Sequence, residues 1–188
     1  MVDVTFSLDN LEYFLLIFVR ISCFVYIAPF LGQNDVPRQV KIGLSAFLSL
    51  LLYNVIERPA LNYTDVIGYA VIVFREGITG LLIGFSANIC SSIVLFAGNI
   101  IDMDIGLSMA TIFDPATGSE TTLTGSFYQK MILLLLIASN MHLYMIQAIG
   151  DSFSVIPIGA VQFDWQHIAN TLSTYMCDMG VIGFRIYL

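Results

Sequence analysis

Apolar residues run through the chain in five long blocks, and short polar stretches separate one block from the next. The first block covers residues 11–30 and carries Arg20 near its middle. It is expected to end at Pro29, because proline breaks the helical ladder and the following GQNDVP favours a turn. The second block covers residues 40–56, and its 15 uncharged residues fall short of the ~20 that a bilayer crossing needs.

The other three blocks are less uniform. The third begins after Asp65, which can cap a helix, and reaches about residue 101, ending in a charge-free run of 25 residues. The fourth covers residues 123–150, and its last 20 residues carry no Asp, Glu, Lys or Arg. A fifth helix is expected to begin at residues 164–167. With no repeat or linker, residues 1–188 are predicted to form one all-α domain, with hairpins of apolar helices and an interrupted region around residues 102–122.

The composition of the chain indicates the class of protein to which this pattern belongs. The chain is 57% hydrophobic and only 11% charged, against about 25% charged residues in soluble domains. A core of 188 residues cannot hide so much apolar surface, so lipid or protein partners must cover it. The sequence therefore predicts an integral membrane protein. Because the chain stops inside the apolar run VIGFRIYL, we expect it to be a C-terminally truncated portion of a longer protein.

Charge and motifs exclude several functions. A net charge of −7 argues against binding nucleic acid, and against a polybasic attachment to anionic lipid. Cys23, Cys90 and Cys177 are widely spaced in apolar runs and are expected to be buried free thiols. His142 and His167 are isolated, and the chain has no zinc spacing, phosphate loop or nucleophile elbow. We therefore expect no enzyme activity, no metal and no cofactor.

Three charges inside apolar blocks need an explanation: Arg20, Arg75 and Glu76. Each would cost roughly 2.5–3.5 kcal/mol at the centre of a membrane. Arg75 and Glu76 are adjacent and do not face each other on a helix, so each needs a partner on another helix or subunit. Structural pairing, an ion or proton relay, and a helix that lies outside the membrane are the three open interpretations.

Small residues recur along one face of the third block at spacings of three, four and seven. Such a stripe lets two helix backbones approach closely, which favours association in membranes. We predict a tight helix–helix seam, within the chain or with a partner. Its members are Gly77, Gly80, Gly84, Ala87, Ser91 and Gly98.

The interrupted region lies within the stretch AGNIIDMDIGLSMATIFDPATGSETTLTG, residues 97–125, which is too apolar for a surface loop and too broken for a spanning helix. Asp102 and Asp104 lie two apart and make a poor carboxylate pair on a helix, whereas Asp114–Pro115 favours a turn. Glycines such as Gly106 loosen the backbone. On the residues alone, a connecting loop, a re-entrant loop and a pore plug remain open.

Four segments resemble motifs of the FliR/SctT family, the R-type subunits of type III export gates. They are APFLGQNDVPRQVKIGL (residues 28–44), FREGITGLLIGF (74–85), AGNIIDMDIGLSMATIFDP (97–115) and NMHLYMIQAIGDSFSVIPIG (140–159). The order and spacing match over most of the chain. One departure is Met141, which stands where the family commonly has glycine before His142.

The resemblance implies a core subunit of the export gate in the bacterial inner membrane, at a flagellar basal body or an injectisome base. The implied partners are P-type and Q-type membrane proteins, the B-type export switch protein and unfolded export substrates. The forms VPRQVK and FDP favour a flagellar system. The family also implies that residues 105–122, here called the plug segment, close the pore. Together with Met103 just before it, the residues expected to act in closure are Ile105, Gly106, Leu107, Ser108, Met109, Ala110, Thr111, Ile112, Phe113, Asp114 and Pro115.

A stand-alone secondary transporter or ion channel is the rival interpretation. It would use Arg20, Arg75, Glu76 and Asp102 along a transport path. Inverted repeats would favour it, and the sequence shows none. A membrane enzyme ranks third, because no catalytic constellation is present.

Overall fold

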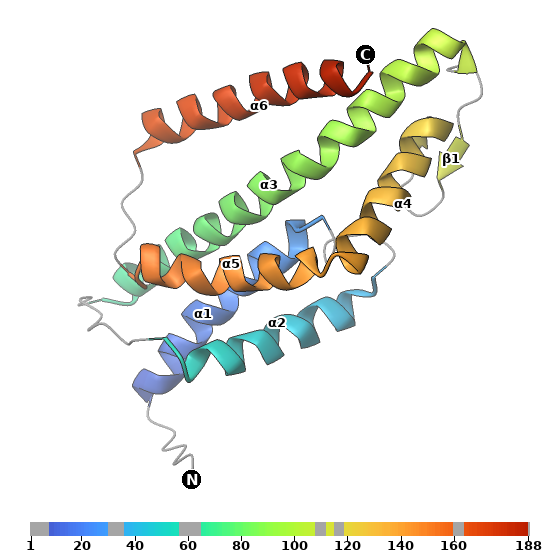
Figure 1. Ribbon diagram of the computed structural model, residues 1–188. Helices are drawn as coiled ribbons and strands as arrows, with labels where there is room; N and C mark the ends of the chain where they lie inside the picture. The colour runs from blue at the N-terminus through green and yellow to red at the C-terminus, as the bar shows by residue number, and fades with distance from the viewer. Residues whose placement is uncertain are drawn as a thin grey trace. The chain divides into compact units, whose positions relative to one another are not determined.

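The computed structural model of the chain describes residues 8–29, 36–56, 65–107, 112–114, 119–159 and 164–187. Six helices account for nearly all of them, which confirms the expected all-α, membrane-type architecture (Figure 1). The elements are α1 (Leu8–Ile27), α2 (Arg38–Tyr53), α3 (Val66–Ile105), β1 (Ile112–Asp114), β2 (Ser119–Thr121), α4 (Leu123–Ala138), α5 (Met141–Val155) and α6 (Trp165–Tyr187).

The helices group into two compact units. Unit 1 comprises Met1–Gly32, Val36–Phe85 and Met145–Gln162, and so contains α1, α2, the first half of α3 and most of α5. Unit 2 comprises Gln33–Asp35, Ser86–Tyr144 and Phe163–Leu188. The single domain expected from the sequence stays a prediction.

Unit 1 is built on a helical hairpin. Helices α1 and α2 run antiparallel and pack along each other (Figure 1). α1 ends at Ile27, two residues before Pro29, because a proline disfavours helical backbone at the residue before it. α2 starts directly after Pro37, and proline suits a helix entrance because its missing N–H is not needed there.

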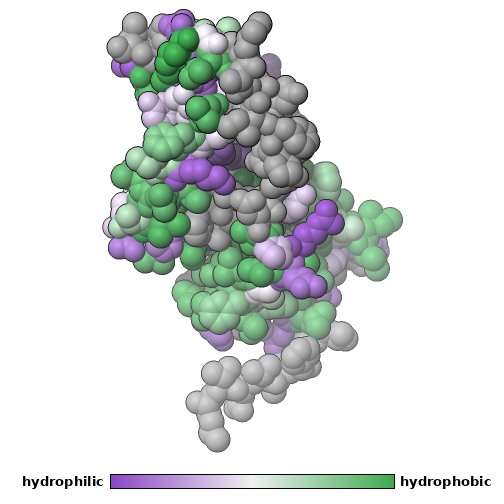
Figure 2. Space-filling view, turned by 90° about the vertical axis from the view of Figure 1, so that its right-hand side faces the viewer, coloured by the Kyte–Doolittle hydropathy of each residue, from purple (hydrophilic) through white to green (hydrophobic). Residues whose placement is uncertain are grey.

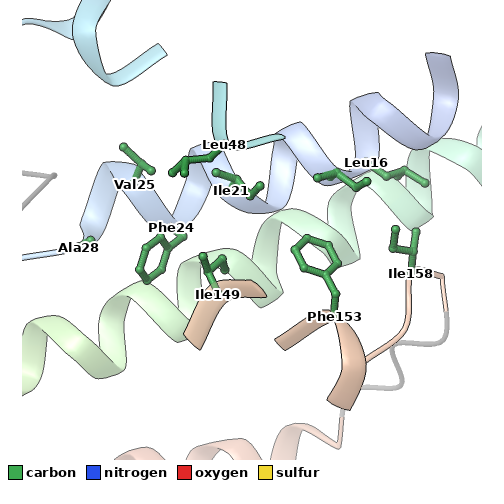
Figure 3. Packing of buried hydrophobic residues seen from close by; sticks show 10 residues of the cluster. Leu16, Ile21, Phe24, Val25, Ala28, Leu48, Ile149, Phe153 and Ile158 are labelled. Carbon is green, nitrogen blue, oxygen red and sulfur yellow. The ribbon is translucent and has the colours of Figure 1, made fainter. Parts of the chain in front are cut away.

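The core of unit 1 lies where α1 meets α2 and the unit 1 part of α5. Figure 3 shows Phe24 of α1 facing Ile149, with Phe153 one turn further along α5. The apolar faces of three helices are thereby removed from their surroundings. The buried cluster consists of Leu16, Ile17, Ile21, Phe24, Val25, Ala28, Leu48, Ile149, Phe153 and Ile158.

Two helix boundaries differ from the sequence prediction. α3 continues to Ile105, beyond the expected residue 101, and stops where Gly106 adopts a left-handed φ of +79°. The fourth apolar block contains two helices, α4 and α5, separated by Ser139 and Asn140, and Asn140 has a φ of +57°. Asparagine tolerates this conformation, which ends α4 although apolar residues predominate on both sides of the break.

The interrupted region in unit 2 contains a short antiparallel strand pair. β1 and β2 pair with Ile112 opposite Thr121, Phe113 opposite Glu120 and Asp114 opposite Ser119. The chain direction therefore reverses between Asp114 and Ser119, where the sequence predicted a turn. Two three-residue strands were not expected from the sequence, since neither is long enough to show an alternating pattern.

Two described helices are long and apolar enough to cross a membrane, Asn10–Ile27 within α1 and Val66–Ile105. The bent pair α4 and α5 makes a third candidate if it crosses as one broken span. Large apolar side chains also lie exposed on every helix, and Figure 2 shows many of them as green patches. Such surface is stable only under lipid or protein neighbours.

Candidate functional site

Two buried charged side chains of unit 1, Arg20 and Glu76, form an ion pair between α1 and α3. Nη2 of Arg20 lies 2.5 Å from Oε2 of Glu76, and Nε of Arg20 donates to the same oxygen at 2.6 Å. Both side chains are fully buried. A charge in this position is stable only when it is paired and hydrogen-bonded, so each residue requires the other.

The surroundings of the pair supply the remaining contacts. Nη1 of Arg20 donates to the carbonyl oxygens of Ser152 and Ile156, at 3.3 and 3.1 Å. The guanidinium also lies 4.2 Å from the ring centre of Phe153. The backbone N–H of Gly159 donates to Oε1 of Glu76 at 3.1 Å. One ion pair thus ties α1 and α3 to the end of α5.

The small-residue stripe explains how α3 comes close enough to α1. A Cβ on Gly80 would overlap the carbonyl oxygen of Arg20, and a Cβ on Gly84 would lie 3.0 Å from that of Phe24. At Gly77 the space is less tight, with Val19 at 3.5 Å. The seam against α1 therefore lies at the level of the ion pair.

Some residues predicted as buried charges or as members of the small-residue stripe do not take part in these contacts. Arg75, expected as a third buried charge, has an exposed side chain, because adjacent residues of a helix point about 100° apart and Glu76 faces the core. Ala87 and Ser91 are half-buried residues of unit 2.

Gly98 serves a second, separate contact in unit 2. A Cβ there would lie 2.5 Å from Cα of Gly125, in the first turn of α4. Gly125 is itself confined, since its own Cβ would lie 2.9 Å from Oδ1 of Asn99. Two facing glycines thus bring α3 and α4 into backbone contact just before the interrupted region begins.

Four polar residues around this contact form what we call the clasp: Asn99 and Asp102 on α3, with Thr122 and Thr124 at the start of α4. The backbone N–H of Thr124 donates to Oδ2 of Asp102 at 2.8 Å, and the Thr124 hydroxyl donates to Oδ1. The Thr122 hydroxyl donates to Oδ1 of Asn99 at 2.6 Å. A buried carboxylate from α3 thereby caps the positive end of α4.

The clasp joins both ends of the interrupted region. Directly after Asp102 the side chains turn outward: Met103 and Ile105 are about two-thirds exposed, at 69% and 64%. Leu107 is exposed as well, and Gly106 has open space around its Cβ position. Flexible apolar side chains therefore follow the clasp directly. In the described part of unit 2 they do not pack into a core of their own.

The predicted closure residues are only partly described. Ile112, Phe113 and Asp114 form strand β1. The expectations for Ser108, Met109, Ala110, Thr111 and Pro115 lie outside the described residues.

Sequence reasoning missed three of the four clasp residues. Asp102 was considered only as half of a poor carboxylate pair and as part of a transport path, and Asn99, Thr122 and Thr124 were not singled out. A signal was present, since TTLTG directly before an apolar helix is typical of an N-terminal cap. The partner of Arg20 was also not identified, because the two residues lie 56 positions apart.

Comparison with known proteins gives a consistent result. Residues 11–188 match the family described as "Bacterial export proteins, family 1". The chain is 34% identical to the flagellar biosynthetic protein FliR of Bacillus subtilis, over 95% of this chain and 70% of that protein. It is 29% identical to FliR of Escherichia coli over 75% of this chain, and 26% identical to the Yop proteins translocation protein T of Yersinia pestis over 80%. It spans only 54% and 58% of the length of these two relatives.

Proposed function

The chain belongs to the bacterial export proteins, family 1, and on this premise we propose that it is a core subunit of a type III protein export gate. The observation that carries the proposal is a family match over residues 11–188 on a chain whose helices suit a membrane. In this role the subunit is not an enzyme and needs no cofactor. It assembles with P-type and Q-type membrane proteins and with the B-type export switch protein in the bacterial inner membrane, and unfolded proteins pass through the assembly.

Within this gate, the plug segment closes the pore. Two features support this role. The clasp fixes both ends of the segment at the junction of α3 and α4. Directly beyond it, Met103, Ile105 and Leu107 are exposed apolar groups that can seal against neighbouring subunits and repack when the gate opens. Apolar constrictions exclude water and ions by dewetting, without charged groups.

The proposed apparatus is flagellar. The flagellar relative from Bacillus subtilis is more similar to this chain than the Yop translocation protein is, with 34% against 26% identity. The basal body of the flagellum is then the place of assembly.

The rival function, a transporter with Arg20 and Glu76 in its path, has less support. Both carboxylate oxygens of Glu76 are engaged, one by Arg20 and the other by the N–H of Gly159. Neither side chain is accessible. A group that relays ions must exchange partners, and this pair is enclosed by three helices that the exchange would have to separate.

Native mass spectrometry of the gently extracted protein, expressed with its neighbouring genes, tests the proposal. We expect one copy of this subunit bound to several copies of two other small membrane proteins. A protein recovered alone, or as a homo-oligomer only, would overturn the gate assignment and favour the transporter.

A further inference from the structure

Unit 1 contains an open hollow that the contacts described so far do not use. It lies between the end of α1, the start of α2 and the first half of α3, and its volume is about 320 Å³. Ligand pockets in proteins commonly enclose about 300–1,000 Å³. The hollow is therefore large enough to receive part of a small molecule.

Its two charged side chains, Arg38 and Lys41, both come from the first turn of α2. α1 and α2 are antiparallel (Figure 1), so Tyr26 in the last turn of α1 lies beside that turn. The Lys41 ammonium lies 5.7 Å from the ring centre of Tyr26. Ile42, the residue after Lys41, and Leu81 of α3 also line the wall. A cationic rim thus adjoins an apolar wall.

The two serines that line the hollow do not make its wall polar. The Ser45 hydroxyl donates to the carbonyl oxygen of Lys41 at 2.7 Å, and the Ser22 hydroxyl donates to that of Val19 at 3.0 Å. Both hydroxyls thus donate to carbonyl oxygens of their own helices. A hydrocarbon chain therefore fits against this wall of the hollow, where a peptide would leave its backbone groups unsatisfied.

The rim stands out in an acidic chain. The protein has a net charge of −7 and seven basic residues, and Arg38 and Lys41 are the closest pair among them in the sequence. They are three residues apart on a helix and share one face. They also lie in the first turn of α2, where the helix dipole favours an anion. These two residues can attract an anion at one site. Such a site differs from attachment to lipid through many basic residues, against which the net charge of the chain argues.

The position suits the boundary of a membrane. The apolar stretch of α1 that can span a bilayer ends at Ile27, so Tyr26 lies at its end, and its side chain is exposed. Tyrosines gather at such boundaries because one end of the ring system is apolar and the other polar. Phospholipid headgroups occupy the same level.

We propose that this hollow binds an anionic phospholipid, with its phosphate held by Arg38 and Lys41 and one acyl chain lying against Ile42 and Leu81. The lipid would fill the hollow between three helices of unit 1 from its membrane side. This site is independent of the proposed gate function, because it rests on the hollow and its charges alone.

Cys23 lines the hollow and reports on its occupancy, whereas Cys90 and Cys177, which were expected to be buried, are exposed thiols of unit 2 and do not line it. The protein, purified together with the membrane proteins that accompany it, is reacted with a maleimide in micelles containing phosphatidylglycerol or phosphatidylcholine. We expect phosphatidylglycerol to slow labelling of Cys23 and phosphatidylcholine to have little effect. Labelling of Cys90 and Cys177 serves as the internal control and should not change.

The double variant Arg38→Gln/Lys41→Gln should weaken the protection by phosphatidylglycerol about 30-fold, because each basic residue near an anionic lipid contributes about fivefold. Lys130→Gln/Arg185→Gln removes the same charge at exposed positions elsewhere and should leave the protection unchanged. If the first variant does not accumulate, the wild-type protein still provides a test, since salt should then weaken the protection.

Three results would overturn the proposal. Equal protection by the two lipids, or none by either, would remove the role of the cationic rim. Protection by glycerol phosphate at the same concentration would assign the rim to a free phosphate, without the acyl chain. Protection that persists without lipid and disappears when the accompanying proteins are removed would assign the hollow to a protein neighbour.

Discussion

Unit 1 and unit 2 both bury polar side chains in apolar helices, but they use them differently. In unit 1, Arg20 and Glu76 lie among the packed side chains of the core and contact α1, α3 and the end of α5. In unit 2, Asp102 lies near the end of α3 and accepts hydrogen bonds from the start of α4. Directly beyond Asp102 the side chains are exposed, as at Met103 and Ile105.

The two halves of α3 are therefore held in different ways. The first half of the helix is fixed on one face by core packing, an ion pair and a glycine seam. The second half is fixed at one level by the clasp and leads into the plug segment. Polar contacts therefore hold helices together in unit 1, whereas in unit 2 they hold the base of the segment that we propose closes the pore.

The largest effect is expected from breaking the ion pair in unit 1. Glu76→Leu leaves the Arg20 guanidinium buried without its counter-charge, which should destabilise the fold by about 3–5 kcal/mol. The matched control is Arg75→Met, at the adjacent exposed position. The yield of folded protein in size-exclusion chromatography and its thermal midpoint in detergent measure the loss.

A second variant shows whether the charge is the cause. In Arg20→Met/Glu76→Leu no unpaired charge remains, and replacing a buried pair by apolar residues is often neutral, so folding should largely return. A double variant as unstable as Glu76→Leu would mean that the shape of these side chains matters more than their charge. A stable Glu76→Leu protein would contradict the role given to the pair.

The next largest effect is expected at the glycine seam. Gly80→Leu/Gly84→Leu places side chains against the carbonyl oxygens of Arg20 and Phe24, which should cost at least about 1–3 kcal/mol and block assembly of the complex. Gly43→Leu on α2 is the control, because open space surrounds its Cβ position. The yield of complex is the measurement. A normal yield from the double variant would show that this stripe faces lipid.

The smallest effect on folding is expected in unit 2. Thr124→Val keeps the shape of the side chain and removes the hydroxyl that donates to Asp102. The base of the plug segment should loosen, so a small ion leak is expected with little change in protein yield. Thr171→Val in α6 is the control, since it removes a hydroxyl bonded only to its own helix. Membrane depolarisation, followed with a potential-sensitive dye, distinguishes the two variants, and an equal signal would argue against the clasp.

Local patterns in the sequence were enough to predict the helices, but not their partners. The end of α1 before Pro29 and the start of α6 at Trp165 could be predicted from neighbouring residues. The break at Asn140 could not, because a single residue in the left-handed conformation ends the helix while the apolar pattern continues. Pairing across the chain, such as that of Arg20 with Glu76, depends on how the helices pack, and no local pattern encodes it.

The site was predictable to a similar degree. The stripe predicted close helix contact at Gly80, and the resemblance to a known family directed attention to residues 105–122. The clasp was missed because its halves, Asp102 and Thr124, lie on either side of the interrupted region and meet only when that region folds back. Strands β1 and β2, three residues each, also depend on that reversal.

The most direct test of the account is the ion conductance of membranes that contain the gate with residues Ile105–Asp114 deleted. The deletion removes the soft apolar part of the plug segment and leaves the clasp and the whole of unit 1 intact. We expect the variant to accumulate and to assemble with its partners, while the membrane becomes leaky to ions. Unchanged conductance in a fully assembled complex would contradict the claim that this segment closes the pore.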